Sequence, residues 1–286
     1  MEALVKARGL SKHYGASKVL DDINLDIMPG KIVGLIGQNG AGKTTALKCI
    51  LGLAPYEGNL EVLGMHPNKD RAKLMEHVCF IADTAILPRW LRVHDAIQLM
   101  ANVHPKFNRE KALKFLSKTD IPSKKTIGKL SKGMITQLHL ALVMAIDVPL
   151  LVLDEPTLGL DILYRKQFYT SLLDDYFDEN RTILITTHQV EEIESLLTDL
   201  VFIKKGKVIL NTTMDNFPDI YTEVQVKTED LDRARALNPI SESKGIGKTR
   251  FIFEGADHDA VRALGDIKIP SISDLFVAKM ENKVER

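Results

Sequence analysis

The stretch that decides the fold is Gly37-Gln38-Asn39-Gly40-Ala41-Gly42-Lys43-Thr44. It matches the pattern G-x-x-x-x-G-K-[ST], in which glycines let backbone N–H groups surround a phosphate without clashes from Cβ atoms. A short apolar run at residues 32–36 precedes it, and a helical pattern follows over residues 43–51, so the positive end of a helix meets the same phosphate. This succession of strand, turn and helix predicts a phosphate-binding loop, in which Lys43 reaches the β- and γ-phosphates of a nucleotide and Thr44 ligates Mg²⁺.

Two carboxylates end the apolar run Leu150-Leu151-Val152-Leu153-Asp154-Glu155. Ligands of α/β sheets bind at the carboxyl ends of the strands, so Asp154 and Glu155 are expected near the phosphate loop. There Asp154 suits a magnesium contact, direct or through another ligand of the ion. Glu155 suits the base that polarises an attacking water. A strand followed by Asp-Glu is by itself more often a solvated strand end, and the phosphate loop reverses that preference.

Composition and charge exclude several classes of protein. The chain has 286 residues, of which 45% are hydrophobic and 27% are charged, as in globular proteins and unlike fibrous or disordered ones. At this length we expect one large domain or two modest ones. Basic and acidic residues both number 38, and a net charge of zero argues against nucleic-acid binding through bulk positive charge. The zero combines 14 basic against 6 acidic residues at 66–132 with 3 against 12 at 147–199.

The cysteines and the apolar stretches indicate in which cellular compartment the protein is expected. Cys49 and Cys79 lack the spacing of a zinc site or a disulfide framework, so we expect buried free thiols. The first ten residues, MEALVKARGL, lack the basic-then-apolar pattern of a signal peptide. Residues 138–153 form the most apolar stretch, but Asp147 and Pro149 interrupt it and it falls short of the ~20 residues that a membrane span requires. We therefore expect a cytoplasmic protein that does not itself cross a membrane.

The chain has three further regions. Residues 66–132 are basic and helical, with helices expected at 96–103 and 109–116. Residues 211–219 are predicted to be a linker, and a small α+β unit is expected beyond it. Other strands are expected at 5–8, 19–27, 150–153, 182–186, 223–227 and 250–254, and a helix at 259–264. Ser271 and Asp274 have the spacing of a capping box, which predicts that a final helix begins there.

Five elements in order make residues 4 to about 215 resemble the nucleotide-binding subunit of an ATP-binding cassette (ABC) transporter. Two are the phosphate loop and the Asp-Glu pair. The third is the signature loop, usually LSGGQ, which is similar to Leu130-Ser131-Lys132-Gly133-Met134, with Ser131 lying 23 residues before Asp154. The D-loop analogue is Leu158-Gly159-Leu160-Asp161, and the switch histidine analogue is His188, 34 residues after Asp154. Tyr14 also matches the aromatic residue that stacks on adenine, although ordinary strand packing would explain it too.

The resemblance implies an α/β fold. It consists of a P-loop NTPase core with an N-terminal antiparallel β-subdomain and a helical subdomain at about 66–140 that carries the signature loop. The ABC ATPase domain would cover residues 1–215, and residues 216–286 would form a small accessory or regulatory α+β domain. The implied ATP-binding residues are Tyr14, Gly37, Gln38, Asn39, Gly40, Ala41, Gly42, Lys43, Thr44, Thr45, Ser131 and Gly133. The implied catalytic residues are Glu155, His188 and Asp83. The implied ligands of Mg²⁺ are Thr44, Asp154 and Asp83.

The resemblance also implies a mechanism and partners. Two cassettes, identical or paralogous, would pack head to tail with each ATP between the phosphate loop of one and the signature loop of the other. Ser131 would donate to the γ-phosphate, and His188 would hold that phosphate and the attacking water. An isolated histidine in this position would more simply begin a helix. The pair would power a separately encoded permease from the inner face of the cell membrane, with no nucleic-acid partner.

Two features depart from the family pattern. The family usually has Gln where this chain has Asp83, and Asp is shorter, charged and unable to donate a hydrogen bond to water. Asp83 would still serve as a magnesium ligand, or alternatively cap a loop or helix. Lys132 and Met134 replace Gly and Gln of LSGGQ, as in single-cassette proteins that serve two-gene exporters. Residues 270–276 are similar to the P-S-L-x-D-x-F ending of that subset, which favours an exporter.

Two other classes of function compete with a transporter subunit. A soluble ABC ATPase that acts on ribosomes or DNA usually has two cassettes in one chain or a long coiled coil between the motifs. Only 88 residues separate Lys43 from Ser131 here, too few for such an arm. A nucleotide-binding module without hydrolysis is the other alternative. The presence of Glu155 and His188 argues against it.

Overall fold

A computed structural model of the chain describes residues 2–82, 87–245 and 247–281. The chain divides into two compact units, Met1–Asn211 and Thr212–Arg286. Each unit has its own sheets and hydrophobic core. The phosphate loop and the acid pair both lie in the first unit.

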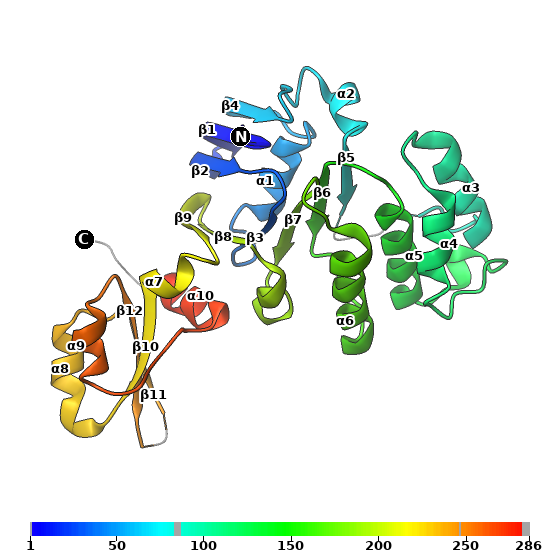
Figure 1. The fold of residues 1–286 in the computed structure, drawn as a ribbon. Helices are drawn as coiled ribbons and strands as arrows, with labels where there is room; N and C mark the ends of the chain where they lie inside the picture. Colours follow the sequence, from blue (N-terminus) through cyan, green and yellow to red (C-terminus); the bar gives the residue numbers. More distant parts are fainter. Residues whose placement is uncertain (1, 83–86, 246, 282–286) are drawn as a thin grey trace. The chain divides into compact units, whose positions relative to one another are not determined.

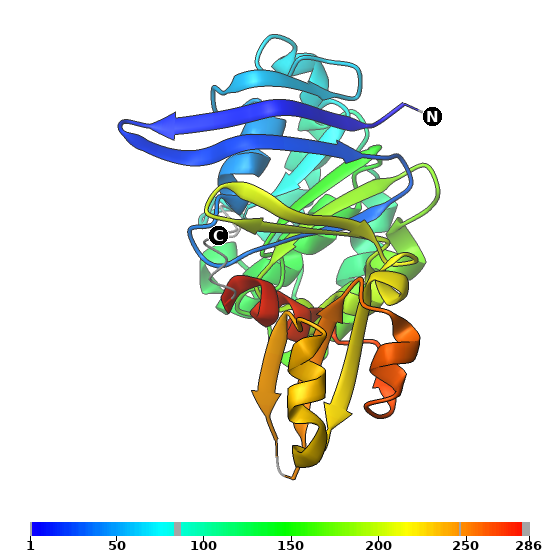
Figure 2. The same cartoon turned by 90° about the vertical axis from the view of Figure 1, so that its left-hand side faces the viewer.

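The first unit begins with an antiparallel sheet of three strands in the order β2-β1-β4. Alternation of apolar and polar residues along these strands turns one face toward the core, as Val5 and Ala7 show by their burial. The long blue hairpin in Figure 2 is formed by β1 and β2. The strands are β1 (Val5–Tyr14), β2 (Ser17–Ile27) and β4 (Glu57–Val62).

A second sheet of six strands forms the centre of this unit, in the order β5-β6-β7-β3-β8-β9. The first five of these strands are parallel. Every residue of β3, β6 and β7 is buried, as expected for parallel strands that are covered on both faces. The strands are β3 (Ile32–Ile36), β5 (Val78–Ile81), β6 (Leu150–Asp154), β7 (Thr182–Thr187), β8 (Asp199–Lys204) and β9 (Lys207–Thr213).

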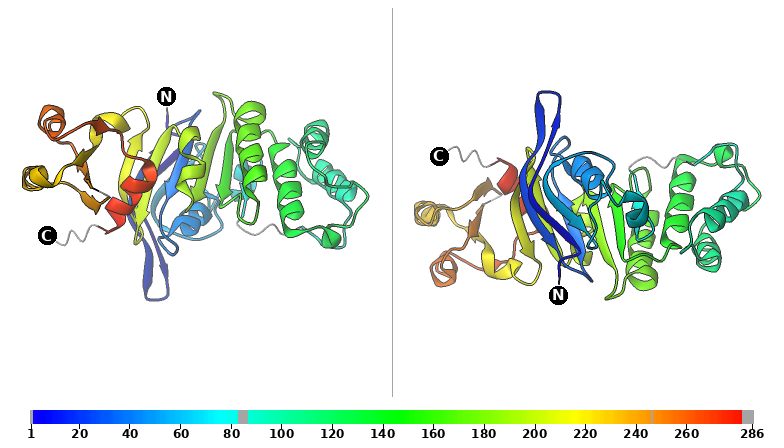
Figure 3. Two further views of the ribbon diagram at one scale, coloured as in Figure 1. Left: turned by 90° about the horizontal axis from the view of Figure 1, so that it is seen from below. Right: turned by 90° about the horizontal axis from the view of Figure 1, so that it is seen from above.

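Helix α1 lies between the two sheets (Figure 1), and its buried residues Leu47 and Ile50 join the core that both sheets share. Helices α3, α4 and α5 gather beyond β5 at one edge of the central sheet, where they are teal and green in Figure 3. The α-helices of this unit are α1 (Lys43–Ile50), the short α2 (Arg71–Met75), α3 (Val93–Val103), α4 (Arg109–Leu116), α5 (Lys132–Met144) and α6 (Ile162–Ser171). A π-helical turn, η2 (Leu172–Tyr176), continues α6, and η1 (Ile127–Lys129), η3 (Val190–Glu192) and η4 (Glu194–Leu196) are single 3₁₀ turns.

The α/β fold with its N-terminal antiparallel sheet is as predicted, but the predicted start of the helical region at residue 66 is too early. Strand β5 lies within that range and pairs in parallel with β6 in the central sheet. The group of helices instead runs from Val93 to Met144. Strand β5 is only four residues long and lies within lysine-rich helical sequence, so its pattern is too brief to be separated from the helices around it.

The second unit has the element order β-α-β-β-α-β, followed by a last helix. Its four antiparallel strands lie in the order β11-β12-β10-β13, the arrangement of a ferredoxin-like split β-α-β fold. The elements are α7 (Phe217–Ile220), β10 (Tyr221–Val226), η5 (Thr228–Asp230), α8 (Leu231–Ala236), β11 (Ser241–Lys244), β12 (Thr249–Glu254), α9 (His258–Arg262), β13 (Ile267–Lys268) and α10 (Ile272–Glu281).

The two faces of this smaller sheet differ. Val224, Phe251 and Phe253 alternate onto the face that packs with α8 and α9. The other face meets α10, where Arg250 pairs with Asp274 at 2.8 Å. This second face is therefore partly polar.

Three features of the second unit differ from the sequence predictions. The stretch predicted as a linker is mostly structured, because β9 continues to Thr213 and α7 begins at Phe217. Helix α8 and strand β11 were not predicted, since both are short and β11 reads Ser-Glu-Ser-Lys without an apolar residue. The final helix begins as expected, with the amide of Asp274 donating to the Ser271 hydroxyl at 3.0 Å.

Both cysteines are buried free thiols, as predicted. Burial raises the pKa of Cys49 to about 11 and that of Cys79 to about 12, so both stay protonated at neutral pH. In residues 2–82, 87–245 and 247–281, none of the helices combines the length and the apolar character needed to cross a bilayer.

Candidate active site

The candidate site is a pocket of about 520 Å³ at the carboxyl edge of the central sheet. It collects segments that lie far apart in the sequence, namely the phosphate loop, the end of β6 and the end of β7. The lining residues are Val19, Gln38, Asn39, Gly40, Gly42, Lys43, Thr44, Thr45, Asp154, Glu155, Leu158 and His188.

Strand register explains why these segments meet. In the parallel ladders, Ile36 of β3 pairs with Thr187 of β7, and Thr186 of β7 pairs with Asp154 of β6. The three neighbouring strands therefore end at nearly the same level. The residues that follow the three strands therefore lie at the same edge of the sheet. These are the phosphate loop after β3, His188 after β7 and Glu155 after β6.

The shape of the phosphate loop depends on glycine at two positions. Gly42 has φ of 109°, and a Cβ there would lie 3.0 Å from the Val19 carbonyl oxygen and 2.9 Å from Leu20 Cδ2. A Cβ at Gly37 would come within 2.5 Å of the Ile203 carbonyl oxygen. Side chains at either position would push the loop away from the strands. The close packing leads the chain directly into α1, so the N-terminal turn of that helix opens on the pocket.

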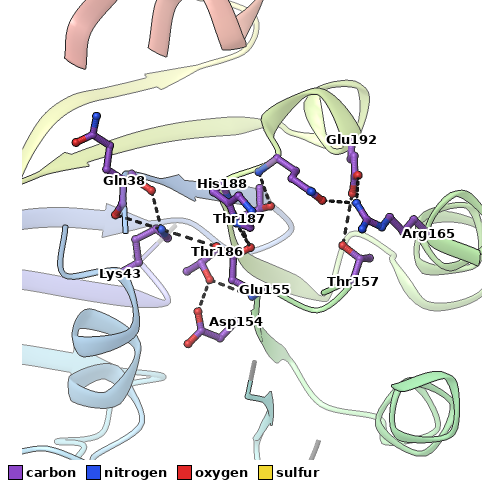
Figure 4. A network of polar contacts seen from close by, with 12 residues as sticks. Gln38, Lys43, Asp154, Glu155, Thr157, Arg165, Thr186, Thr187, His188 and Glu192 are labelled. Atoms are coloured by element: carbon purple, nitrogen blue, oxygen red, sulfur yellow. Dashed lines mark hydrogen bonds and ion pairs between the residues drawn. The ribbon is translucent and has the colours of Figure 1, made fainter. Parts of the chain in front are cut away.

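Lys43 is the buried cation of the site, only 6% exposed. Its ammonium donates to the Gly37 carbonyl at 2.6 Å and lies 3.8 Å from Glu155 Oε1. Figure 4 shows the Lys43 side chain directed toward Glu155. Burial lowers the pKa of Lys43, and the neighbouring carboxylates of Glu155 and Asp154 oppose that shift. The loop thus holds a partly desolvated positive charge beside the acid pair, which suits a phosphate.

Asp154 and Glu155 leave β6 in different directions. Asp154 is 1% exposed, and the Thr186 hydroxyl donates to its Oδ1 at 2.5 Å. Glu155 has φ of 47°, a left-handed conformation that costs a non-glycine residue roughly 1–3 kcal/mol. Its amide donates to the Thr186 carbonyl at 3.1 Å and also approaches the Thr186 hydroxyl at 3.3 Å. Thr186 therefore anchors both residues of the acid pair.

His188 follows the last residue of β7 and contacts the same carboxylate as Lys43. Its Nδ1 lies 2.9 Å from Glu155 Oε2, and its backbone amide donates to that oxygen at 3.4 Å. Lys43 is nearest the other oxygen, Oε1. The carboxyl group of Glu155 is thus held between a lysine and a histidine at the wall of the pocket (Figure 4).

Magnesium fits the donors present. The Thr44 hydroxyl and the Asp154 carboxylate both line the pocket, and oxygen atoms are the ligands that Mg²⁺ prefers. Nowhere in the described part of the chain do three or more His, Cys, Asp or Glu side chains cluster as a metal site would require. Mg²⁺ commonly takes one or two protein ligands and the rest from phosphates and water.

The structure brings together most of the predicted nucleotide-binding residues. Seven of the nine from Gly37 to Thr45 line the pocket, whereas Gly37 and Ala41 support the loop from behind. The Gly37 carbonyl accepts from Lys43, and the Ala41 carbonyl accepts from the Gly206 amide at 2.9 Å. Asp83 lies outside the described residues.

Three further predicted residues, outside the phosphate loop, are not among those that line the pocket. Tyr14 ends β1 with half of its surface exposed, and the ammonium of Lys12 lies 4.7 Å from its ring centroid. Ser131 caps α5 by accepting from the Met134 amide at 3.2 Å, with Gly133 in the first turn of that helix. The signature segment lies beside the D-loop instead, since a Cβ at Gly159 would be 3.3 Å from Lys132 Cε.

Thr186 is the site residue that sequence reasoning missed. A signal was present, because two threonines precede His188 at the end of an otherwise apolar strand. Buried hydroxyl groups in such a position need hydrogen-bond partners. The partner could not be assigned before the register of β6 and β7 was known.

The class of protein follows from this geometry. A parallel strand leads through a glycine-rich loop into a helix, and a buried lysine of that loop faces carboxylates at the end of a nearby strand. These features define a P-loop nucleoside triphosphatase.

Comparisons with known proteins narrow the class to a family. The family model described as ABC transporter matches residues 20–158. The chain is 27% identical to the ABC transporter ATP-binding protein YtrB of Bacillus subtilis, over 98% of this chain and 99% of that protein. It is 31% identical to the Nod factor export ATP-binding protein I of Cupriavidus metallidurans, over 88% of this chain and 87% of the other. A solved structure of the ATP-binding subunit of an ABC transporter matches with a TM-score of 0.68 and 26% identity, over 76% of this chain and 92% of that one.

The chain therefore belongs to the family of ABC transporter ATP-binding proteins. It is an ATP-binding subunit of an ABC transporter, and thus an ATPase whose hydrolysis of ATP powers transport. The resemblance seen in the sequence motifs is confirmed.

Thr186→Val should weaken the folded state, because it leaves the buried Asp154 carboxylate without the hydroxyl that donates to it. We expect the free energy of unfolding to fall by about 1–3 kcal/mol, measured on the full chain by chemical denaturation followed by circular dichroism. Thr186→Ser keeps the hydroxyl and should lose much less. Equal stability of the valine variant and wild type would show that this bond does not anchor the acid pair.

Proposed function

We propose that ATP is hydrolysed in the pocket described above by the residues that surround its γ-phosphate. The observation that carries this proposal is the Glu155 carboxyl group, held between Lys43 at 3.8 Å and His188 at 2.9 Å. An acid, a cation and a histidine at the wall of one pocket are the groups that attack by water on a phosphate requires.

The phosphate loop binds the triphosphate. Backbone N–H groups from Gln38 to Thr45 and the N-terminal turn of α1 surround the β-phosphate, and the Lys43 ammonium bridges the β- and γ-phosphates. Thr44 and Asp154 hold Mg²⁺, which neutralises part of the phosphate charge when bound. Burial of Lys43 supports this assignment, since a desolvated cation gains most from a multiply charged partner.

Glu155 acts as the general base. Its carboxylate takes a proton from the attacking water, whose oxygen forms a bond to the γ-phosphorus as the bond to the β-phosphate oxygen breaks and ADP leaves. His188 donates to the γ-phosphate and orients the water. The contact of His188 with Glu155 supports this pairing of roles. Asp83 is the remaining candidate ligand for magnesium.

Each ATP is shared by two cassettes packed head to tail, identical or paralogous. Ser131, Gly133 and the N-terminus of α5 contact the γ-phosphate held by the other cassette, and Tyr14 stacks on adenine. Their positions away from the pocket of their own chain support a role in the opposite site. The exposure of Tyr14 supports a stacking role.

The dimer drives a separately encoded membrane permease, most simply an exporter, from the cytoplasmic face of the cell membrane. Two observations support export, namely the Ser131-Lys132-Gly133-Met134 form of the signature loop and a relative whose name describes Nod factor export. Residues 216–286 form an accessory or regulatory domain. Its separate hydrophobic core supports an independent role.

Glu155→Gln should retain ATP binding and abolish turnover, because the amide cannot accept the proton of the attacking water. We expect the ATP-bound variant to accumulate as a dimer, visible by size-exclusion chromatography with Mg²⁺ and ATP, while phosphate release becomes undetectable. Glu191→Gln, at an exposed position nearby, is the matched control and should behave as wild type. Wild-type turnover in Glu155→Gln would remove Glu155 from the chemistry.

Recovery of the protein from membranes tests the transporter assignment. We expect the tagged full chain, isolated from membranes in mild detergent, to bring down a protein with several transmembrane helices, identified by mass spectrometry. A Glu155→Gln sample with ATP should bring down the same partner. Recovery of ribosomal proteins or DNA without such a membrane protein would contradict the assignment.

A further inference from the structure

Arg165, in the first turns of α6, joins two segments that leave different strands of the central sheet. Its Nε donates to the Leu160 carbonyl at 2.8 Å. Leu160 belongs to the D-loop segment that follows β6. The same guanidinium donates through Nη1 to Gln189, the residue directly after His188, and to Glu192 Oε1 at 2.5 Å. Figure 4 shows Arg165 reaching toward this second segment beside His188.

Further contacts tie the network to the acid-pair strand. The Thr157 hydroxyl donates to Glu192 Oε2 at 3.5 Å and lies 3.3 Å from the Tyr169 hydroxyl. Thr157 and Tyr169 are both buried, and the side chains of Arg165 and Glu192 are only 22% and 26% exposed. These contacts are therefore shielded from water, where ion pairs and hydrogen bonds restrain geometry more firmly than at an open surface.

The segment after His188 forms a 3₁₀ turn, η3, at the point where β7 has ended. Burial of Val190 within this turn and of Ile193 directly after it helps to hold the turn in place. The Gln189 amide donates to the Thr187 hydroxyl at 2.9 Å, which holds the backbone at one point. The guanidinium holds the side chains of Gln189 and Glu192, at the start and the end of this turn.

We infer that Arg165 is a positioning residue, which aligns His188 with Glu155 by fixing the segment after His188 to the D-loop. It does not line the pocket and is not a catalytic residue. This inference rests on the proposed role of His188 in hydrolysis. It adds that the D-loop backbone and the switch histidine move as one unit within a single cassette, because one guanidinium is bonded both to the Leu160 carbonyl and to the side chain of Gln189, the residue directly after His188.

An arginine suits this task for a geometric reason. Its planar guanidinium presents separate donors in fixed directions, so Nε serves Leu160 while Nη1 serves Gln189 and Glu192. A lysine has the same charge but one nitrogen at the end of a flexible chain. It would keep an ion pair with Glu192 and lose the simultaneous bond to the D-loop.

The test compares Arg165→Met, Arg165→Lys and the control Lys166→Met in wild-type and His188→Ala backgrounds of the full chain. Lys166 is exposed and adjacent in sequence, and in the described part of the chain the structure gives its side chain no hydrogen bond or ion pair. Each variant is assayed for kcat, KM for ATP and thermal midpoint. Small displacements of catalytic groups cost up to about 100-fold in rate, so we expect kcat of Arg165→Met to fall about 10- to 100-fold.

The distribution of the losses decides the matter. If Arg165 is a positioning residue, KM for ATP in Arg165→Met stays within about 2-fold of the wild-type value, and Arg165→Lys recovers only part of the wild-type kcat. In the His188→Ala background, Arg165→Met then lowers kcat by less than about 3-fold. Equal losses from Arg165→Met in the two backgrounds would overturn the inference and leave the role of His188 intact. Wild-type turnover in His188→Ala alone would instead contradict the proposed function, and the inference with it. If Arg165→Met proves unstable, Arg165→Lys provides the test. A wild-type kcat in Arg165→Lys would also overturn the inference.

Discussion

The site depends on the register of three neighbouring parallel strands. Because Ile36 pairs with Thr187 and Thr186 pairs with Asp154, β3, β7 and β6 end at one level of the sheet. The phosphate loop, His188 and Glu155 directly follow these strand ends. They therefore lie close together at one edge of the sheet. A shift of one residue in either ladder would move a functional side chain by more than 3 Å and turn it to the opposite face of the sheet. Full burial of all three strands makes such a shift costly.

Polar contacts then refine what the register brings together. Thr186 holds both Asp154 and Glu155, and Glu155 in turn contacts Lys43 and His188. Each of these groups is therefore oriented by another group of the site and not by solvent. Preorganisation of this kind matters most for phosphoryl transfer, where catalysis consists mainly of positioning and electrostatic stabilisation. The left-handed backbone at Glu155 is consistent with local strain kept for that purpose.

The sequence predicted the core of the site and not its supports. Glycine, lysine and acid residues at fixed spacing have one common use, so Lys43 and the Asp-Glu pair could be identified without a structure. Thr186 and Arg165 bond to side chains more than 20 residues away in the sequence, so these partners, Asp154, Gln189 and Glu192, could not be assigned from the sequence alone. The small second unit was only partly predicted, because α8 and β11 are short and polar and their periodicity is too brief to read.

The proposed contact of the Lys43 ammonium, held in the phosphate loop, with the β- and γ-phosphates of ATP decides whether this pocket is the nucleotide site. It is tested most directly by titrating the full chain with a fluorescent ATP analogue and Mg²⁺, with Lys43→Met and Lys48→Met as the compared variants. Lys48 is exposed on the same helix, so its replacement is the control. A hydrogen bond to a charged group is worth roughly 1.5–3 kcal/mol, so Lys43→Met should bind about 10- to 100-fold more weakly. Equal affinity of Lys43→Met and wild type would contradict the account.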